Sequence, residues 1–264
     1  MNLKAIGICL SIFCFLNSSS LASDDSHLLP EDSIYSEFYP LSENDDLVER
    51  YEENVLKVFA DVFDQDVFGR VIVYPSFQNE YAVALKHNES KYSLLVLDPT
   101  IHIWRFSLVE MYEAGEVKIL GDDDGSQLAE ELKELKQGLP EAPTDIPVET
   151  CEREISADLG EKLFFLWGDM LFRTRYPDKR PLRLERDDTI IVGADGTTYH
   201  FSFEYNYKRL AGQIWSPDAD SVTGRFVTIA RTLADACFEK GKIDVVELDK
   251  LVSELSAELS NAPY

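Results

Sequence analysis

Hydrophobic positions along the chain separate stretches of helix from stretches of strand. Apolar side chains recur at helical spacing in four stretches: residues 42–59, 159–171, 226–238 and 244–259. Short runs rich in β-branched residues and bounded by turn-forming residues predict strands at 69–74, 80–85, 92–97 and 210–215. These helices and strands cluster instead of alternating strictly. The pattern therefore predicts an α+β fold, with antiparallel sheet packed against amphipathic helices.

Weaker patterns extend this scheme. Residues 102–104 and 116–120 indicate a short pair of strands on either side of a brief helix near residues 108–111. Residues 188–192 indicate another strand, and the Asp-Gly turn that follows predicts a hairpin with the next stretch.

That next stretch, TTYHFSFEYNY at 197–207, alternates aromatic and polar residues. Alternate residues of a strand face opposite sides of the sheet. The odd positions therefore form one aromatic face, made of Tyr199, Phe201, Phe203, Tyr205 and Tyr207. Each aromatic side chain can bury roughly 150–250 Å², so this face is predicted to be a wall of the core. The alternative is a platform for carbohydrate or peptidoglycan.

The even positions of the same stretch place His200, Ser202 and Glu204 in a row. A histidine beside a carboxylate is a candidate acid/base pair, which makes His200 and Glu204 the catalytic candidates. The competing interpretation is a solvated strand face that carries polar residues without chemistry.

The N-terminus has the pattern of an export signal. Lys4 precedes an apolar run of 12 residues at 5–16, and Ser20-Leu21-Ala22 fits a signal-peptidase site. Residues 1–22 are predicted to be a signal peptide, and residues 23–41 an acidic, flexible lead-in. No later run is apolar enough to span a membrane. The chain is expected to be exported, to the periplasm of a Gram-negative bacterium or otherwise to the exterior.

Composition divides the remaining chain into two α+β parts. Residues 121–147 are acidic and contain three prolines, so they predict a linker or a long loop. They separate an N-terminal part, 42–120, from a C-terminal part, 148–264.

Acidic residues dominate the charge. The formal net charge is −24, and removing Lys4 with residues 1–22 leaves −25. Such a surface repels nucleic acid and attracts basic molecules. A basic protein is therefore the expected partner, and nucleic-acid binding is not expected.

Two cysteines, Cys151 and Cys237, remain after the predicted signal peptide. An even pair in an oxidising compartment predicts one disulfide, and the alternative is two free thiols.

Basic residues gather in one short segment, which is the candidate anion-binding site: Arg173, Arg175, Lys179, Arg180, Arg183 and Arg186. Arginines there would bind a carboxylate or phosphate through paired hydrogen bonds. The alternative is a set of intramolecular ion pairs.

Other chemistry has little support in the sequence. Acidic turns at 122–125 and 218–221 resemble fragments of calcium loops but lack the full pattern. The histidines show no zinc-ligand spacing. Neither a metal site nor a cofactor is expected.

Two segments, DGTTYHF at 195–201 and AGQIWSP at 211–217, precede a helix that contains a cysteine. This arrangement, over residues 165–240, resembles exported bacterial proteins of unknown function. The resemblance implies a periplasmic setting and carries no functional residue.

These observations predict an exported acidic binding protein without catalytic activity, such as an inhibitor or immunity-type partner of a basic protein. Two alternatives remain open. One is a cell-envelope hydrolase that uses His200 and Glu204, and the other is an envelope assembly factor.

Overall fold

The computed structural model of the protein describes six stretches of the chain: residues 27–30, 45–89, 91–115, 132–175, 196–238 and 245–261. Its centre is a six-stranded antiparallel sheet with the order β4-β3-β2-β1-β5-β6. The strands are β1 (Val67–Pro75), β2 (Tyr81–Asn88), β3 (Lys91–Pro99), β4 (Val148–Ile155), β5 (Thr197–Tyr205) and β6 (Lys208–Trp215). The predicted α+β class is confirmed.

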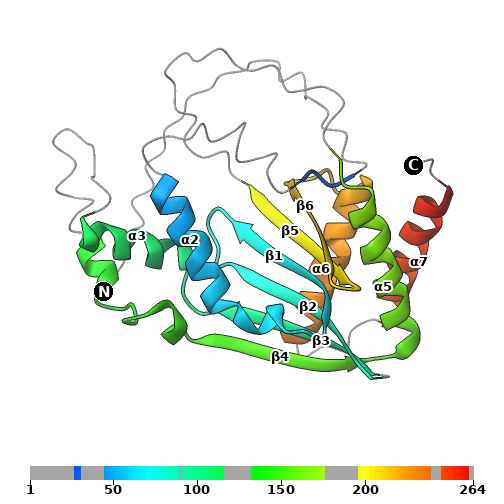
Figure 1. Ribbon diagram of the computed structural model, residues 1–264, viewed down its shortest axis with the longest axis horizontal. Helices are drawn as coiled ribbons and strands as arrows, with labels where there is room; N and C mark the ends of the chain where they lie inside the picture. Colours follow the sequence, from blue (N-terminus) through cyan, green and yellow to red (C-terminus); the bar gives the residue numbers. More distant parts are fainter. Residues whose placement is uncertain are drawn as a thin grey trace, which may run out of the picture.

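Helices cover both faces of the sheet (Figure 1). One face packs against α2 (Asp45–Val58), the 3-10 turns η1 (Ala60–Phe63) and η2 (Pro143–Asp145), and α3 (Ile103–Ala114). The other packs against α5 (Ala157–Phe172), α6 (Val222–Phe238) and α7 (Val245–Asn261). Burial on both faces explains why β1, β2 and β3 contain nearly continuous apolar runs.

Two hydrophobic cores result. The larger lies under α5, α6 and α7, where the ring of Phe226 lies 4.5 Å from that of Trp167 and 4.4 Å from that of Phe201. The smaller lies under α2 and α3 around Phe59, Ile72 and Ile103. Close packing also requires Gly160 in α5, because an added Cβ there would come within 2.1 Å of the Tyr92 ring on β3.

The predicted strand at 102–104 is wrong. His102 is the N-cap residue of α3, and Ile103 and Trp104 form the first helical turn. The short apolar run resembles a strand because the side chain that caps this helix, described below, lies 23 residues before its first residue in the sequence. The predicted strands at 116–120 and 188–192 lie outside the described residues.

Strand β4 was not predicted, because its sequence VETCEREI has charged residues where a core strand has apolar ones. Cys151 therefore lies within a strand at the edge of the sheet. The sheet also takes β1 to β3 from before residues 121–147 and β4 to β6 from after them. Within that segment, residues 132–136 form a helical turn.

The opposite edge of the sheet is covered by the chain's own N-terminal region. Leu29 forms an antiparallel bridge with Gln213 of β6, with N···O distances of 2.7 and 2.8 Å in the two directions. Leu28 is fully buried in the larger core, and its carbonyl oxygen accepts a hydrogen bond from the backbone of Arg175. Residues 27–30, inside the predicted lead-in, are therefore part of the packed structure.

Candidate functional site

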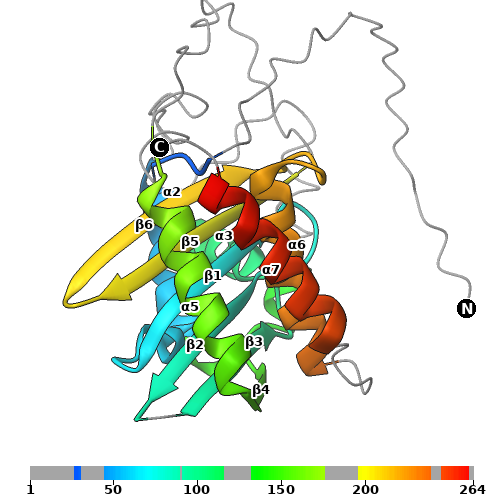
Figure 2. The ribbon, with the colours of Figure 1, turned by 90° about the vertical axis from the view of Figure 1, so that its right-hand side faces the viewer.

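The aromatic stretch is divided between core and surface. Tyr199, Phe201 and Phe203 are buried against the helices, so the core-wall prediction is confirmed for these three. Tyr205 is about half exposed, with its ring 5.8 Å from that of Phe164 on α5, and Tyr207 is fully exposed. The end of the β5–β6 hairpin projects beyond α5 (Figure 2). Asn206 and Tyr207 form its tight turn with φ values of 50° and 62°.

The strand face of His200 and Glu204 is solvated only in part: Glu204 is exposed, whereas His200 is half-buried. Its ring lies 4.7 Å from the ring of Tyr74 on β1, and the neighbouring Ser202 is buried. Burial, together with the positive charge of Arg209, lowers the pKa of the imidazole to about 4. His200 is therefore neutral at neutral pH.

Glu204 lies further along β5 and contacts a different partner. Its Oε1 accepts a hydrogen bond of 2.8 Å from Arg70. Arg70 is buried, donates to the carbonyl of Val62 in η1, and lies over the ring of Phe63. Four residues of strand place Glu204 roughly 13 Å from His200. That separation is too long for direct proton transfer, so the structure does not bring the two catalytic candidates together.

Two members of the basic segment lie in the described part of the chain. The Arg173 guanidinium at the end of α5 donates a 2.6 Å hydrogen bond to the carbonyl of Leu259 in α7. Arg175 contributes its backbone N–H to Leu28, as described above. These contacts join secondary-structure elements. The other four members, Lys179, Arg180, Arg183 and Arg186, lie outside the described residues, and the anion site stays a prediction.

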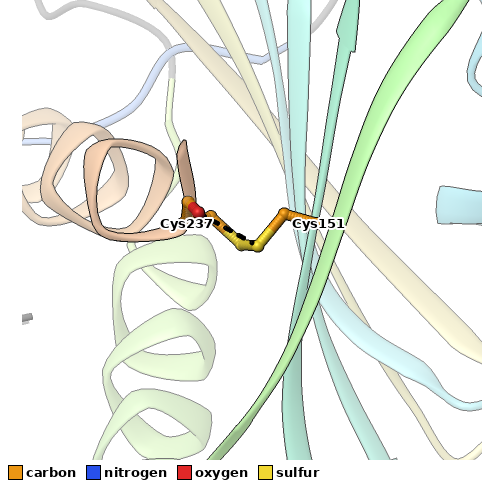
Figure 3. Close-up of a disulfide and its surroundings, with 2 residues drawn as sticks. All are labelled: Cys151 and Cys237. Atoms are coloured by element: carbon orange, nitrogen blue, oxygen red, sulfur yellow. Dashed lines mark hydrogen bonds between the residues drawn. A yellow bond between two sulfur atoms is a disulfide. The ribbon is translucent and has the colours of Figure 1, made fainter. Parts of the chain in front are cut away.

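Cys151 and Cys237 form a disulfide, as predicted (Figure 3). Their Cα atoms lie 5.8 Å apart, at the usual spacing for such a bond. The bond joins the middle of β4 to the last turn of α6. It therefore fixes the outer strand of the sheet to the helical layer.

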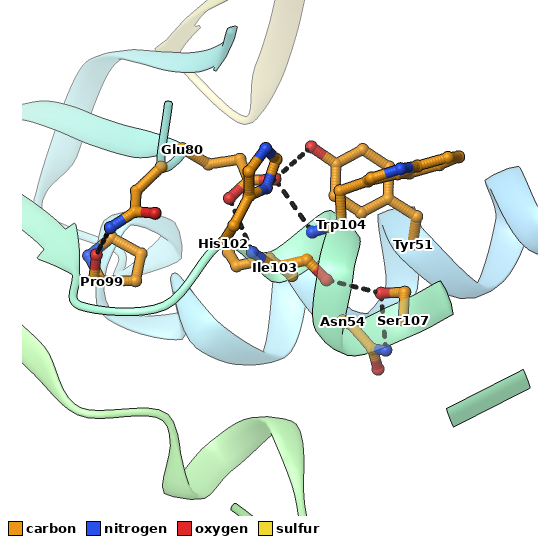
Figure 4. Close-up of polar contacts among 9 residues, drawn as sticks. Tyr51, Asn54, Glu80, Pro99, His102, Ile103, Trp104 and Ser107 are labelled. Atoms are coloured by element: carbon orange, nitrogen blue, oxygen red, sulfur yellow. Dashed lines mark hydrogen bonds and ion pairs between the residues drawn. The ribbon is translucent and has the colours of Figure 1, made fainter. Parts of the chain in front are cut away.

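A buried carboxylate that sequence reasoning missed lies at the start of α3 (Figure 4). Glu80 is fully buried and accepts hydrogen bonds from the backbone N–H groups of Ile103 (2.7 Å) and Trp104 (3.0 Å). The Tyr51 hydroxyl donates at 2.7 Å, and Nδ1 of His102 lies 2.9 Å away. Glu80 thus satisfies N–H groups that a helix start leaves without partners. No local sequence signal links Glu80 to this helix.

Burial raises the pKa of Glu80. Its interactions with His102, with the Tyr51 hydroxyl and with a backbone N–H lower this pKa, and their combined effect is larger than that of burial. The net result is a pKa below the usual value, so Glu80 is charged at neutral pH. A negative charge is also favoured by the positive end of the α3 dipole. With its oxygens engaged by four groups, Glu80 is positioned to hold α3 in place.

A second set of polar contacts joins α2 to α3 beside this carboxylate. The buried Asn54 side chain donates to Ser107 (3.0 Å) and to Glu110 (2.9 Å). Ser107 in turn donates to the carbonyl of Ile103. The two helices are therefore held in register by hydrogen bonds as well as by the smaller core.

Strand β4 presents an acidic outer edge. Glu149, Glu152 and Glu154 are exposed. Lys86 lies 3.9 Å from Glu152, which also accepts a hydrogen bond of 3.2 Å from Ser93, and Lys91 lies 3.7 Å from Glu154. The Lys91–Glu154 pair is exposed on both sides, and exposed pairs contribute about 0–1 kcal/mol. These three glutamates, together with the backbone of β4, are called the acidic edge below.

One glutamate of the acidic edge faces a like charge. Asp98 on β3 is the direct cross-strand partner of Glu149. Partial burial, and then the charge of Glu149, raise the pKa of Asp98 above its usual value. Like charges directly opposite each other destabilise a sheet, so a cation placed here would be stabilising.

The acidic turn at 218–221 starts a helix. The Asp218 carboxylate accepts from the backbone N–H of Asp220, and the Ser221 hydroxyl accepts from Gly224 at the start of α6. The other acidic turn, 122–125, lies outside the described residues. Within the described residues, no three His, Cys, Asp or Glu side chains are grouped so as to hold a metal.

Comparison with protein families, with curated proteins and with solved structures finds no match to this chain. In the described part of the chain, no helix has both the length and the apolar character needed to cross a membrane.

Proposed function

We propose that this chain is an exported acidic protein of the bacterial envelope that binds a basic protein and acts as its inhibitor or immunity-type partner. The proposal rests on the distribution of charged side chains on the surface. Among the described residues, exposed acidic side chains outnumber exposed basic ones by about two to one. The described surface therefore carries an excess of negative charge that is available to a partner.

Several basic side chains form ion pairs with acidic side chains of the same chain. These basic side chains are therefore not available to offset the other acidic side chains on the surface. Lys162 lies 2.6 Å from Asp249, and Arg225 lies 2.5 Å from Glu258. A field of one sign accelerates association with a partner of opposite charge and repels others of like charge. A rigid, disulfide-linked acidic protein is suited to that role outside the cell.

Export is part of the proposal. The features of residues 1–22 support a cleaved signal peptide. A disulfide between Cys151 and Cys237 is compatible with an oxidising compartment such as the periplasm.

The test is chemical crosslinking in the living cell, followed by purification of the mature protein from the envelope and mass spectrometry. We expect one basic protein at close to equal amounts. Its non-covalent complex should weaken by about tenfold or more between 50 and 200 mM salt, because several charge contacts contribute. Recovery of no protein, or of a partner whose binding is insensitive to salt, would contradict the proposal.

A further inference from the structure

We infer that the acidic edge of β4 binds an extended basic segment of the partner, which adds to the sheet as a further strand. This inference rests on the proposed function and specifies where and how the partner binds. Addition of a strand to a sheet edge is a general mode of recognition in which main-chain hydrogen bonds supply affinity and side chains supply specificity.

The backbone of β4 is suited to this mode. β4 pairs with β3 over eight consecutive residues without a bulge, from Val148 opposite Pro99 to Ile155 opposite Tyr92. No other strand of the described residues pairs with its outer side. Figure 1 shows β4 as a long strand along that edge. The N–H and C=O groups that point outward from such an edge are a template for another chain.

The edge is also held in place before any partner arrives. The disulfide fixes Cys151 at the middle of the strand. Ile155 is buried in the larger core at one end, and Val148 packs against the smaller core at the other. A rigid binding element loses little conformational entropy on association.

The two edges of the sheet differ in whether another segment of the chain covers them. Residues 27–30 of the same chain lie along part of the β6 edge through the bridge between Leu29 and Gln213. On the β4 side, the described chain supplies no such segment. The β4 edge is thus the one that remains for a partner.

The side chains select the occupant. A second copy of this chain would bring a second strand with three glutamates and one arginine, and therefore the same net negative charge, to this edge, which is unfavourable. A basic strand would place lysine or arginine opposite them. Because directly opposite residues share a face, an antiparallel strand needs basic residues opposite Glu154, Glu152 and Glu149, which corresponds to the spacing K-x-K-x-x-K. The residue opposite Arg153 should not be basic.

The probe is a synthetic peptide with this spacing, VKEKTTKV, compared with a peptide of the same composition and scrambled order. We expect the mature protein to bind the spaced peptide about tenfold more tightly than the scrambled one, since three cross-strand charge pairs are at stake. Hydrogen exchange should show protection of amides in 148–155 by the spaced peptide. No variant is needed for this measurement.

The matched variants keep the net charge equal and change only its location. Glu149→Lys, Glu152→Lys and Glu154→Lys together should weaken binding of the spaced peptide by about tenfold or more. The control combines Glu49→Lys, Glu134→Lys and Glu161→Lys, at exposed sites on other elements. It should weaken binding by less than about threefold, through the long-range field alone.

Equal losses in the two triple variants, or equal binding of the two peptides, would overturn the inference. Either result would leave the proposed function intact if a basic protein is still recovered from the envelope. Failure to recover such a protein would instead count against the proposed function, so the two outcomes are distinguishable.

Discussion

Replacement of Glu80 by alanine is expected to lower the free energy of unfolding by about 3–5 kcal/mol, because it breaks a buried charged network. The substitution would leave the N–H groups of Ile103 and Trp104 and the Tyr51 hydroxyl without their acceptor. Glu80→Gln keeps the shape and one carbonyl oxygen. It should therefore cost less, about 1–3 kcal/mol.

Denaturant unfolding monitored by circular dichroism measures these differences, with exposed Glu161→Ala and Glu161→Gln as controls near zero. The dependence of stability on pH provides a second measurement. Since the folded pKa of Glu80 lies below its usual 4.5, its contribution to stability is present above that pH and is lost as the pH falls through the folded pKa. As the pH falls, the free energy of unfolding should decrease more steeply in the wild type than in Glu80→Gln. Equal stability of Glu80→Ala and Glu161→Ala would contradict this role.

Loss of the disulfide is expected to have a comparably large effect. Cys151 and Cys237 are separated by 86 residues in the sequence. Closing a loop of that size stabilises the folded state by about 4–5 kcal/mol in the chain-entropy model. The free energy of unfolding of the mature protein should fall by about this amount in reductant.

The control is the variant with Cys151→Ser and Cys237→Ser, which should have the lower stability and no response to reductant. A difference of less than about 1 kcal/mol between oxidised and reduced wild type would contradict the prediction. Hydrogen exchange of residues 148–155 on reduction would show in addition whether the bond keeps β4 ordered.

Periodicity was sufficient for the elements that bury one clear apolar face. The helices at 159–171 and 226–238 and the strands β1 to β3 were predicted because their side chains repeat with the helical or strand period. The pairing of Cys151 with Cys237 followed from their number alone. Such features depend on the local pattern of side chains or on the number of cysteines.

Other features depend on contacts between residues far apart in the sequence. Glu80 accepts hydrogen bonds from Ile103 and Trp104 in the first turn of α3. β4 is a strand because β3 pairs with it in spite of its charged side chains. The aromatic stretch is one pattern in the sequence, but the helices cover only its first part, so Tyr205 and Tyr207 are exposed. No local rule distinguishes the two halves.

The candidate sites show the same limit. His200 and Glu204 share one strand face, with Ser202 between them. That face was interpreted without knowing that α2 and α3 lie over the same side of the sheet. Their contacts are with Tyr74 and Arg70 instead. The acidic edge, in contrast, becomes visible only when the strand order places β4 at the outside.

Site-specific photo-crosslinking in the cell envelope tests the central claim most directly. A photoreactive amino acid would replace Thr150, which is exposed between the glutamates of β4, or Ser253, which is exposed on α7. The account predicts that a basic protein is crosslinked from position 150 and not from position 253, and that excess VKEKTTKV peptide abolishes the product. Crosslinking of that protein from position 253 alone, or of no protein from position 150, would contradict it.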